Sequence, residues 1–134
     1  GDGDLKNELQ KLAKPDLKIN FIGFVEPNNL PYYYKNSDIF LFTSRYDGWG
    51  VVINESMAAG LPIIVTKNCG ASEYIDNFGG FVVECDPTVI SKKLETLIAN
   101  QLLRKKMGLY NFEKSKNISS DSIAKKMYHL ICNN

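Results

Sequence analysis

Residues 37–69, SDIFLFTSRYDGWGVVINESMAAGLPIIVTKNC, predict a strand, a loop, a helix and a second strand in direct succession. The apolar run at 39–42 has the aromatic and branched residues of a fully buried strand. A helix is expected over 51–59, because Gly60 and the proline just beyond it are typical of helix ends. The apolar run at 62–65 predicts the next strand. Short buried strands joined through a helix are typical of parallel α/β sheets, so this segment decides the fold class.

The rest of the chain continues the alternation of strands and helices. We therefore predict one domain over residues 1–134, a Rossmann-like parallel sheet flanked by helices and followed by a helical C-terminal tail. The predicted strands lie near 18–23, 38–42, 62–66 and 80–84. The predicted helices lie at 5–14, 27–36, 51–59 and 71–76, and from 88 onward, with breaks after Asn100 and at 119–121. Asp86 and Pro87 are typical of a helix start.

Composition excludes several classes of function. The chain has 134 residues, 44% of them hydrophobic and 23% charged, and a formal net charge of +1, which gives no reason to expect a nucleic-acid partner. No apolar run approaches the roughly 18 residues of a membrane-spanning helix, and no signal pattern begins the chain. The cysteines, Cys69, Cys85 and Cys132, are widely spaced, which favours reduced thiols and a cytoplasmic protein. The single histidine, His129, forms no recognisable catalytic set or metal cluster with other residues.

The glycine loop between the first strand and the helix is the strongest candidate for a site. Two glycines flank Trp49, so the backbone can approach a ligand closely. In a parallel sheet such a loop directs amides and the positive end of the helix dipole at one point, which favours phosphate. The helix is apolar on nearly every face and should be buried, yet it carries Glu55. Asp47 on the loop is expected to face the same cleft, and two acids flanking amides suit a nucleotide-sugar.

The loop and helix also resemble a known family. Residues 47–62 follow the pattern acid-Gly-aromatic-Gly, three apolar residues, x-Glu-x-Met-Ala-x-Gly-x-Pro. This pattern resembles the nucleotide-sugar-binding signature of retaining GT-B glycosyltransferases, family 4 above all. The family has two glutamates separated by seven residues; Asp47 and Glu55 keep this spacing, with Asp in place of the first Glu. Further matches in the same order are Gly1–Gly3 (strand-turn motif), Asn20–Val25 (base-binding strand) and Gly70–Glu73 (Gly-x-x-Glu).

The resemblance implies a role for each matching residue. Glu55 would hold the ribose hydroxyls, and Asp47 would bind hydroxyls of the donor sugar and is the candidate catalytic residue. The amides of Gly48, Trp49, Gly50 and Val51 would meet the sugar and the diphosphate. The donor would be a nucleoside-diphosphate sugar, with no metal and no other cofactor.

Two further segments match the same resemblance, and the tyrosines before the strand at 38–42 are a separate candidate. Gly23 and Phe24 would bring their backbone to the nucleobase. Glu73 is either a surface acid favoured by a helix dipole or a residue of the donor site. The tyrosines at 32–34 cannot share one helix face, so one or two must be exposed, either for ordinary packing or to stack on a base.

The resemblance implies a larger enzyme. The family's C-terminal domain usually begins with a strand and helix carrying a Gly-Arg and a Lys for the diphosphate, and an N-terminal domain binds the acceptor. Without them we expect the chain to be inactive by itself. The full enzyme would transfer a hexosyl unit to a glycan or lipid-linked acceptor, in surface polysaccharide biosynthesis, in the cytoplasm or at the inner face of the membrane. An apolar stripe on the last predicted helix would be left uncovered and would allow self-association.

Other functions fit the same fold. A non-catalytic nucleotide-binding or interaction module would keep the domain without its chemistry. A sugar-nucleotide epimerase would need catalytic acids and a histidine that the sequence does not supply. A receiver-type protein would need an acidic cluster at the strand ends, which is missing.

Overall fold

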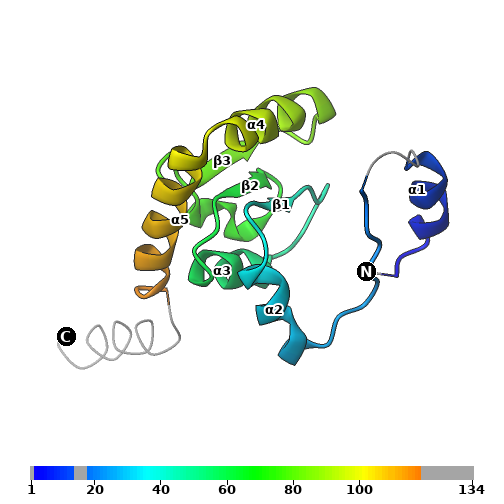
Figure 1. Ribbon diagram of the computed structural model, residues 1–134, viewed down its shortest axis with the longest axis horizontal. Helices are drawn as coiled ribbons and strands as arrows, with labels where there is room; N and C mark the ends of the chain where they lie inside the picture. Colours follow the sequence, from blue (N-terminus) through cyan, green and yellow to red (C-terminus); the bar gives the residue numbers. More distant parts are fainter. Residues whose placement is uncertain (1, 14–17, 119–134) are drawn as a thin grey trace. The chain divides into compact units, whose positions relative to one another are not determined.

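The computed structural model describes residues 2–13 and 18–118. The chain forms two compact units, Gly1–Tyr33 and Tyr34–Asn134, which we describe one at a time (Figure 1). The third predicted helix of the tail, together with His129 and Cys132, lies outside the described residues.

The first unit contains one helix, an extended segment and a helical turn. Helix α1, Lys6–Leu12, has no buried residue, and the 3₁₀ helix Pro27–Asn29 leads into α2, Leu30–Lys35. The strand predicted at 18–23 is wrong: these residues have no strand pairing in the described structure. An alternating pattern makes a strand only when a neighbour supplies the ladder. Here the amide of Phe24 donates to the Asp2 side chain at 2.7 Å instead.

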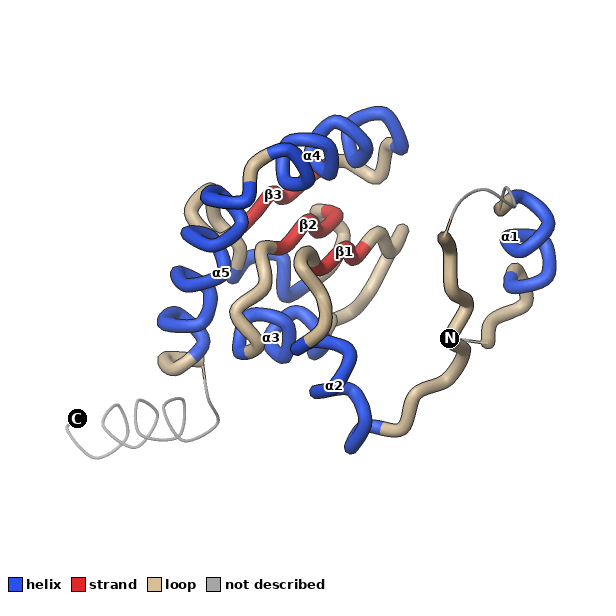
Figure 2. The backbone as a smooth tube through the Cα atoms, viewed as in Figure 1, coloured by secondary structure: helices blue, strands red, loops and turns tan. Residues whose placement is uncertain are grey.

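The second unit is built on a three-stranded parallel sheet. The strands β1, Phe40–Phe42, β2, Ile63–Thr66, and β3, Gly80–Val83, lie in the order β1-β2-β3 (Figure 2). Phe40 pairs with Ile63, and Ile63 with Gly80. Every residue of the central strand β2 is buried, as expected for a parallel sheet covered on both faces. The parallel α/β fold expected from the sequence is confirmed.

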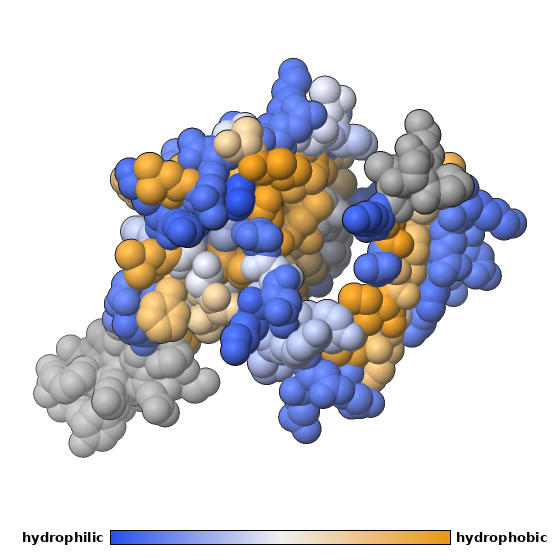
Figure 3. Space-filling view, in the orientation of Figure 1, coloured by the Kyte–Doolittle hydropathy of each residue, from blue (hydrophilic) through white to orange (hydrophobic). Residues whose placement is uncertain are grey.

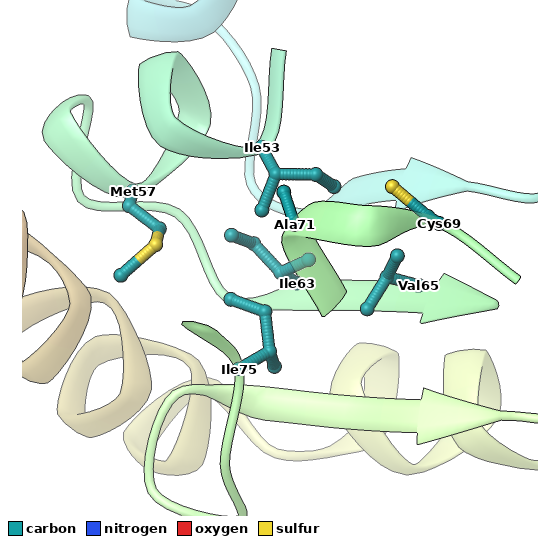
Figure 4. Close-up of a cluster of buried hydrophobic side chains, with 7 residues drawn as sticks. All are labelled: Ile53, Met57, Ile63, Val65, Cys69, Ala71 and Ile75. Carbon is teal, nitrogen blue, oxygen red and sulfur yellow. The ribbon is translucent and has the colours of Figure 1, made fainter. Parts of the chain in front are cut away.

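Two hydrophobic clusters lie on opposite faces of the sheet because successive side chains of β2 alternate in direction. The first cluster joins β2 to α3, Val51–Ala58, and to the 3₁₀ helix Gly70–Tyr74 (Figure 4). Its buried members are Ile53, Met57, Ile63, Val65, Cys69, Ala71 and Ile75. The second cluster joins the sheet to α4, Pro87–Ala99, and α5, Gln101–Ser115. Its buried members are Ile64, Val83, Leu97 and Met107.

The starts of α4 and α5 are set by side-chain caps. The Asp86 carboxylate accepts hydrogen bonds from the amides of Thr88 and Val89, at 2.8 and 3.0 Å, which confirms the predicted cap. Asn100 caps α5 in the same way, at 2.9 Å from the amide of Leu103. The outer surface of both helices is largely hydrophilic with separate apolar residues (Figure 3), among them Ile98, Leu102, Leu109 and Phe112.

Asp76 ties the loop before β3 to α5. Its carboxylate accepts from the Tyr110 hydroxyl and from the Lys114 ammonium, each at 2.7 Å, and from the amide of Phe78 at 3.0 Å. Burial raises the pKa of Asp76, but the hydrogen bonds from Lys114, Tyr110 and Phe78 outweigh it, and the net pKa lies below the usual value. A lowered folded-state pKa stabilises the fold above the unfolded pKa, and this stabilisation is lost as the pH falls through the folded pKa.

We therefore predict that Asp76→Asn lowers the Tm by about 2–4 °C at pH 7, the size expected for a partly exposed ion pair. The difference from the unmodified chain should shrink as the pH falls from about 4, the ordinary pKa of the carboxylate in the unfolded chain, through the lower folded-state pKa of Asp76. Thermal melts at several pH values measure both effects, with Glu113→Gln, in the exposed pair with Lys116, as the control expected to change little. A difference that grows toward low pH would contradict the assignment.

Candidate functional site

The loops that follow β1 and β2 are held together at the carboxyl edge of the sheet. Asp47 and Cys69 form an isolated parallel bridge. In it the Asp47 amide donates to the Asn68 carbonyl, and the Gly70 amide donates to the Asp47 carbonyl, each at 3.2 Å. The Asn68 side-chain amide also donates to the carbonyl of Arg45 at 2.9 Å. The glycine loop is thus fixed by backbone contacts on both sides of Asp47.

Gly50 connects this loop to α3. It has φ of +80° and is the N-cap residue of the helix, and its carbonyl accepts from the amide of Ile53 at 2.9 Å. A Cβ at this position would overlap the Cys69 sulfur, so glycine is required both by the left-handed backbone and by the space. No side chain caps α3. The amides of Val51 and Val52, the first two of the helix, have no intrahelical acceptor and are therefore available to an anion.

Asp47 lines an open pocket of about 340 Å³ beside the loop. Its Oδ1 accepts from the amide of Trp49 at 3.0 Å, which shapes the turn before the helix. Lys67 also lines the pocket and forms an ion pair of 2.7 Å with Glu84, so its charge is already partly matched. The pocket therefore offers a carboxylate, backbone groups and a paired cation to a polar ligand.

Glu55 is exposed, so the expectation that it is buried is wrong. The prediction failed because apolar residues of this helix are not all buried. Helix α3 buries only Ile53, Ser56 and Met57, and the alanines at its end lie at the surface. The Glu55 carboxylate accepts a hydrogen bond from the Tyr34 hydroxyl at 2.8 Å. It lines a second pocket, of about 270 Å³, with Asn54, Ala58, Ser115 and Ile118. Asp47 and Glu55 thus line different pockets, and the first turn of α3 lies between them in the chain.

Trp49 and Val51 are exposed although both are apolar, 51% and 59% respectively. The Trp49 ring packs edge-to-face on Tyr74, with ring centroids 5.9 Å apart. The Trp49 carbonyl accepts from the amide of Ala71 at 2.6 Å. These contacts hold the loop in place while leaving an apolar surface next to the helix N-terminus.

The other predicted site residues lie in two places. Glu73 is exposed on the 3₁₀ helix and lines the same pocket as Asp47. Gly23 and Phe24 belong to the first unit. There Gly23 has φ of +81°, and Phe24 lines a pocket of about 350 Å³ with Tyr32 and Tyr33. Tyr32 is 69% exposed and Tyr34 half-buried, which confirms that the three tyrosines do not share one environment.

Sequence reasoning did not predict the contacts that three residues make at the site. Asn68 and Gly70 hold the loop, and a Cβ on Gly70 would lie 2.5 Å from the Gly48 carbonyl oxygen. In the sequence, this close approach of the two loops is indicated only by the glycine of the Gly-x-x-Glu segment, Gly70. Tyr34 is the third, and no local pattern connects it with Glu55, which lies 21 residues along the chain.

Among the described residues, no three His, Cys, Asp or Glu side chains gather as metal ligands. Cys69 and Cys85 are free thiols, as expected from their spacing. No helix in the described part of the chain is long and apolar enough to cross a membrane.

Comparison with known proteins assigns the family. The chain is 30% identical over 119 residues to spore coat protein SA of Bacillus subtilis, and 32% identical over 137 residues to alpha-monoglucosyldiacylglycerol synthase of Acholeplasma laidlawii. These alignments cover 83% and 98% of the chain, but the chain spans only about a third of either relative, 32% and 33%.

A solved structure is similar over most of the chain. It is the C-terminal domain of a glycosyl transferase group 1 family protein from Francisella tularensis, with a TM-score of 0.77 and 32% identity. The alignment covers 85% of this chain and 62% of that one. Residues 1–114 match the family described as glycosyl transferases group 1. The expected family is confirmed, and the chain belongs to the group 1 glycosyltransferases, with their GT-B fold.

Proposed function

We propose that the chain is the donor-binding part of a retaining glycosyltransferase whose donor is a nucleoside-diphosphate sugar. The observation that carries this proposal is the fixed glycine loop at the uncapped N-terminus of α3, with Asp47 before it and Glu55 one turn inside the helix. Uncapped helix amides favour a diphosphate. The two acids are acceptors for hydroxyl groups on either side of it.

In this proposal each part of the site has one task. Glu55 accepts hydrogen bonds from the ribose, and Asp47 accepts them from the donor sugar. The amides of Gly48, Gly50 and Val51 and the dipole of α3 stabilise the negative charge that develops as the nucleoside diphosphate leaves, while the Trp49 amide stays on Asp47. The same groups neutralise the diphosphate, so we propose that donor binding needs no metal. Trp49 and Val51 would shield the reacting bond from water.

The proposed acceptor follows from the relatives. The name of the Acholeplasma relative supports a hexosyl unit and a lipid acceptor, and that of the Bacillus relative supports a role at a surface structure. We propose that the full enzyme transfers a hexosyl unit to a glycan or lipid-linked acceptor, in surface glycan assembly at the cytoplasmic side.

Calorimetry on the chain tests the donor site directly. We expect binding of one of the uridine, guanosine or adenosine diphosphates and of its sugar conjugate, unchanged by a chelator. Glu55→Ala should weaken both ligands by about 10- to 100-fold, the range of hydrogen bonds to a charged group. Asp47→Ala should weaken the sugar conjugate more than the free diphosphate. Glu95→Ala, on the exposed side of α4, is the control expected to change neither. If no nucleotide binds at millimolar concentration, the chain is a non-catalytic module instead.

A further inference from the structure

The Glu55 carboxylate has a single hydrogen-bond partner among the described residues, the Tyr34 hydroxyl. The bond is 2.8 Å long and joins the end of α2 to the first turns of α3. It is made to Oε2, so Oε1 has no protein partner in the described part of the chain. One carboxylate oxygen of this exposed side chain is thus held by the protein, and the other is left for a ligand.

The Tyr34 ring is itself held by aromatic residues of β1. Its centroid lies 5.8 Å from that of Phe40 in a tilted arrangement, and the Phe40 ring stacks on Phe42 at 6.3 Å. Both phenylalanines pack against the hydrophobic cluster under α3. A Cβ on Gly50 would lie 3.5 Å from the Phe42 ring. The same aromatic row therefore supports the Tyr34 hydroxyl at one end and the glycine loop at the other.

The Tyr34 hydroxyl acts as a donor throughout the working pH range. Burial of the phenol, together with its hydrogen bond to the Glu55 carboxylate, raises the pKa of Tyr34 well above its usual range. The phenol therefore stays protonated and keeps donating to the carboxylate. Because the Tyr34 ring is half-buried, its hydroxyl restricts the rotamers of the exposed Glu55 side chain.

We propose that Tyr34 is a positioning residue for nucleotide binding. It fixes the Glu55 side chain so that its second oxygen is presented to a ribose hydroxyl, an inference that rests on the proposed donor site. An exposed glutamate would otherwise lose its rotamer freedom only when the ligand binds, which weakens affinity. With Tyr34 in place, this ordering is complete before the nucleotide arrives.

Tyr34→Phe removes the hydroxyl and keeps the ring on Phe40. We expect the affinity for the nucleoside diphosphate that the chain binds to fall about 3- to 10-fold, which corresponds to one ordered side chain. Affinity for the analogue lacking the ribose hydroxyls should change less than 2-fold, because Glu55 then has no group to meet. In a Glu55→Ala chain the further change Tyr34→Phe should have no effect on affinity.

Tyr110→Phe is the matched control, since it removes a hydroxyl that donates to a carboxylate, Asp76, away from the site. Tyr110→Phe should lower the Tm without changing nucleotide affinity. If Tyr34 had only a structural role, Tyr34→Phe would likewise lower the Tm and leave nucleotide affinity unchanged. If the unmodified chain binds and Glu55→Ala weakens binding while Tyr34→Phe does not, the inference is overturned and the proposed function stands. Absence of binding by the unmodified chain would overturn both.

Discussion

Gly50→Ala is expected to destabilise the second unit by about 2–4 kcal/mol and to weaken nucleotide binding more than 10-fold. The backbone at Gly50 has φ of +80°, where a Cβ costs about 1–2 kcal/mol. The added carbon would also overlap the Cys69 sulfur, which is buried under the loop. The first turn of α3 must shift to relieve both conflicts, and the amides that would meet the diphosphate shift with it.

Gly48→Ala is the matched control in the same loop. Gly48 has no positive φ, and no atom lies within 4 Å of an added Cβ. Urea denaturation should therefore place Gly48→Ala within about 0.5 kcal/mol of the unmodified chain. Equal losses for the two variants would mean that loop flexibility, and not the fixed conformation at Gly50, is what matters.

A second substitution separates the two causes of the destabilisation expected for Gly50→Ala, the positive φ and the overlap with sulfur. Cys69→Ala removes the sulfur, so the double variant Gly50→Ala with Cys69→Ala should be less destabilised than the sum of the single variants. We expect a favourable coupling of about 1–2 kcal/mol, because the overlap is relieved and the strained φ remains. Strict additivity would show that the sulfur plays no part.

Much of the fold could be predicted because its signals are local. The cap at Asp86 depends on residues within three positions, and the end of α3 depends on Gly60. The buried strands at 40–42 and 63–66 stand out as short apolar runs. The segment at 18–23 has a similar pattern, but a strand also needs a partner, which the sequence does not encode locally.

The site could be predicted in part for the same reason. The acids, the glycines and the helix start lie within nine residues of one another, so the motif at 47–55 is visible in the sequence. The exposure of Glu55 could not be predicted, because small apolar residues such as Ala58 do not indicate which face of the helix is buried. The contacts from Tyr34 and Asn68 cross between distant segments, so only the folded chain reveals them.

The second large effect is expected at Asn111, at the opposite edge of the sheet. Its buried side-chain amide donates to the carbonyls of Leu61 and Gly79, both at 2.7 Å. These carbonyls precede β2 and β3, so one side chain of α5 joins the amino ends of two strands. Asn111→Ala removes the donor to the Leu61 carbonyl, leaves the Gly79 carbonyl with only the Ile63 amide at 3.3 Å, and opens a cavity. We expect a loss of about 2–4 kcal/mol, seen as a Tm lower by roughly 10 °C.

Asn111→Asp gives the isosteric comparison, since it keeps the volume and replaces the donor by an acceptor. At pH 7 it should destabilise at least as much as alanine, because a carboxylate would face two carbonyl oxygens. Lys106→Ala, exposed on the same helix, should change the Tm by less than about 2 °C. If Asn111→Asp is as stable as the unmodified chain, the two hydrogen bonds contribute little. Below its Tm, Asn111→Ala should still bind nucleotide with nearly unchanged affinity, because the loops that carry the site follow β1 and β2, at the opposite ends of the strands.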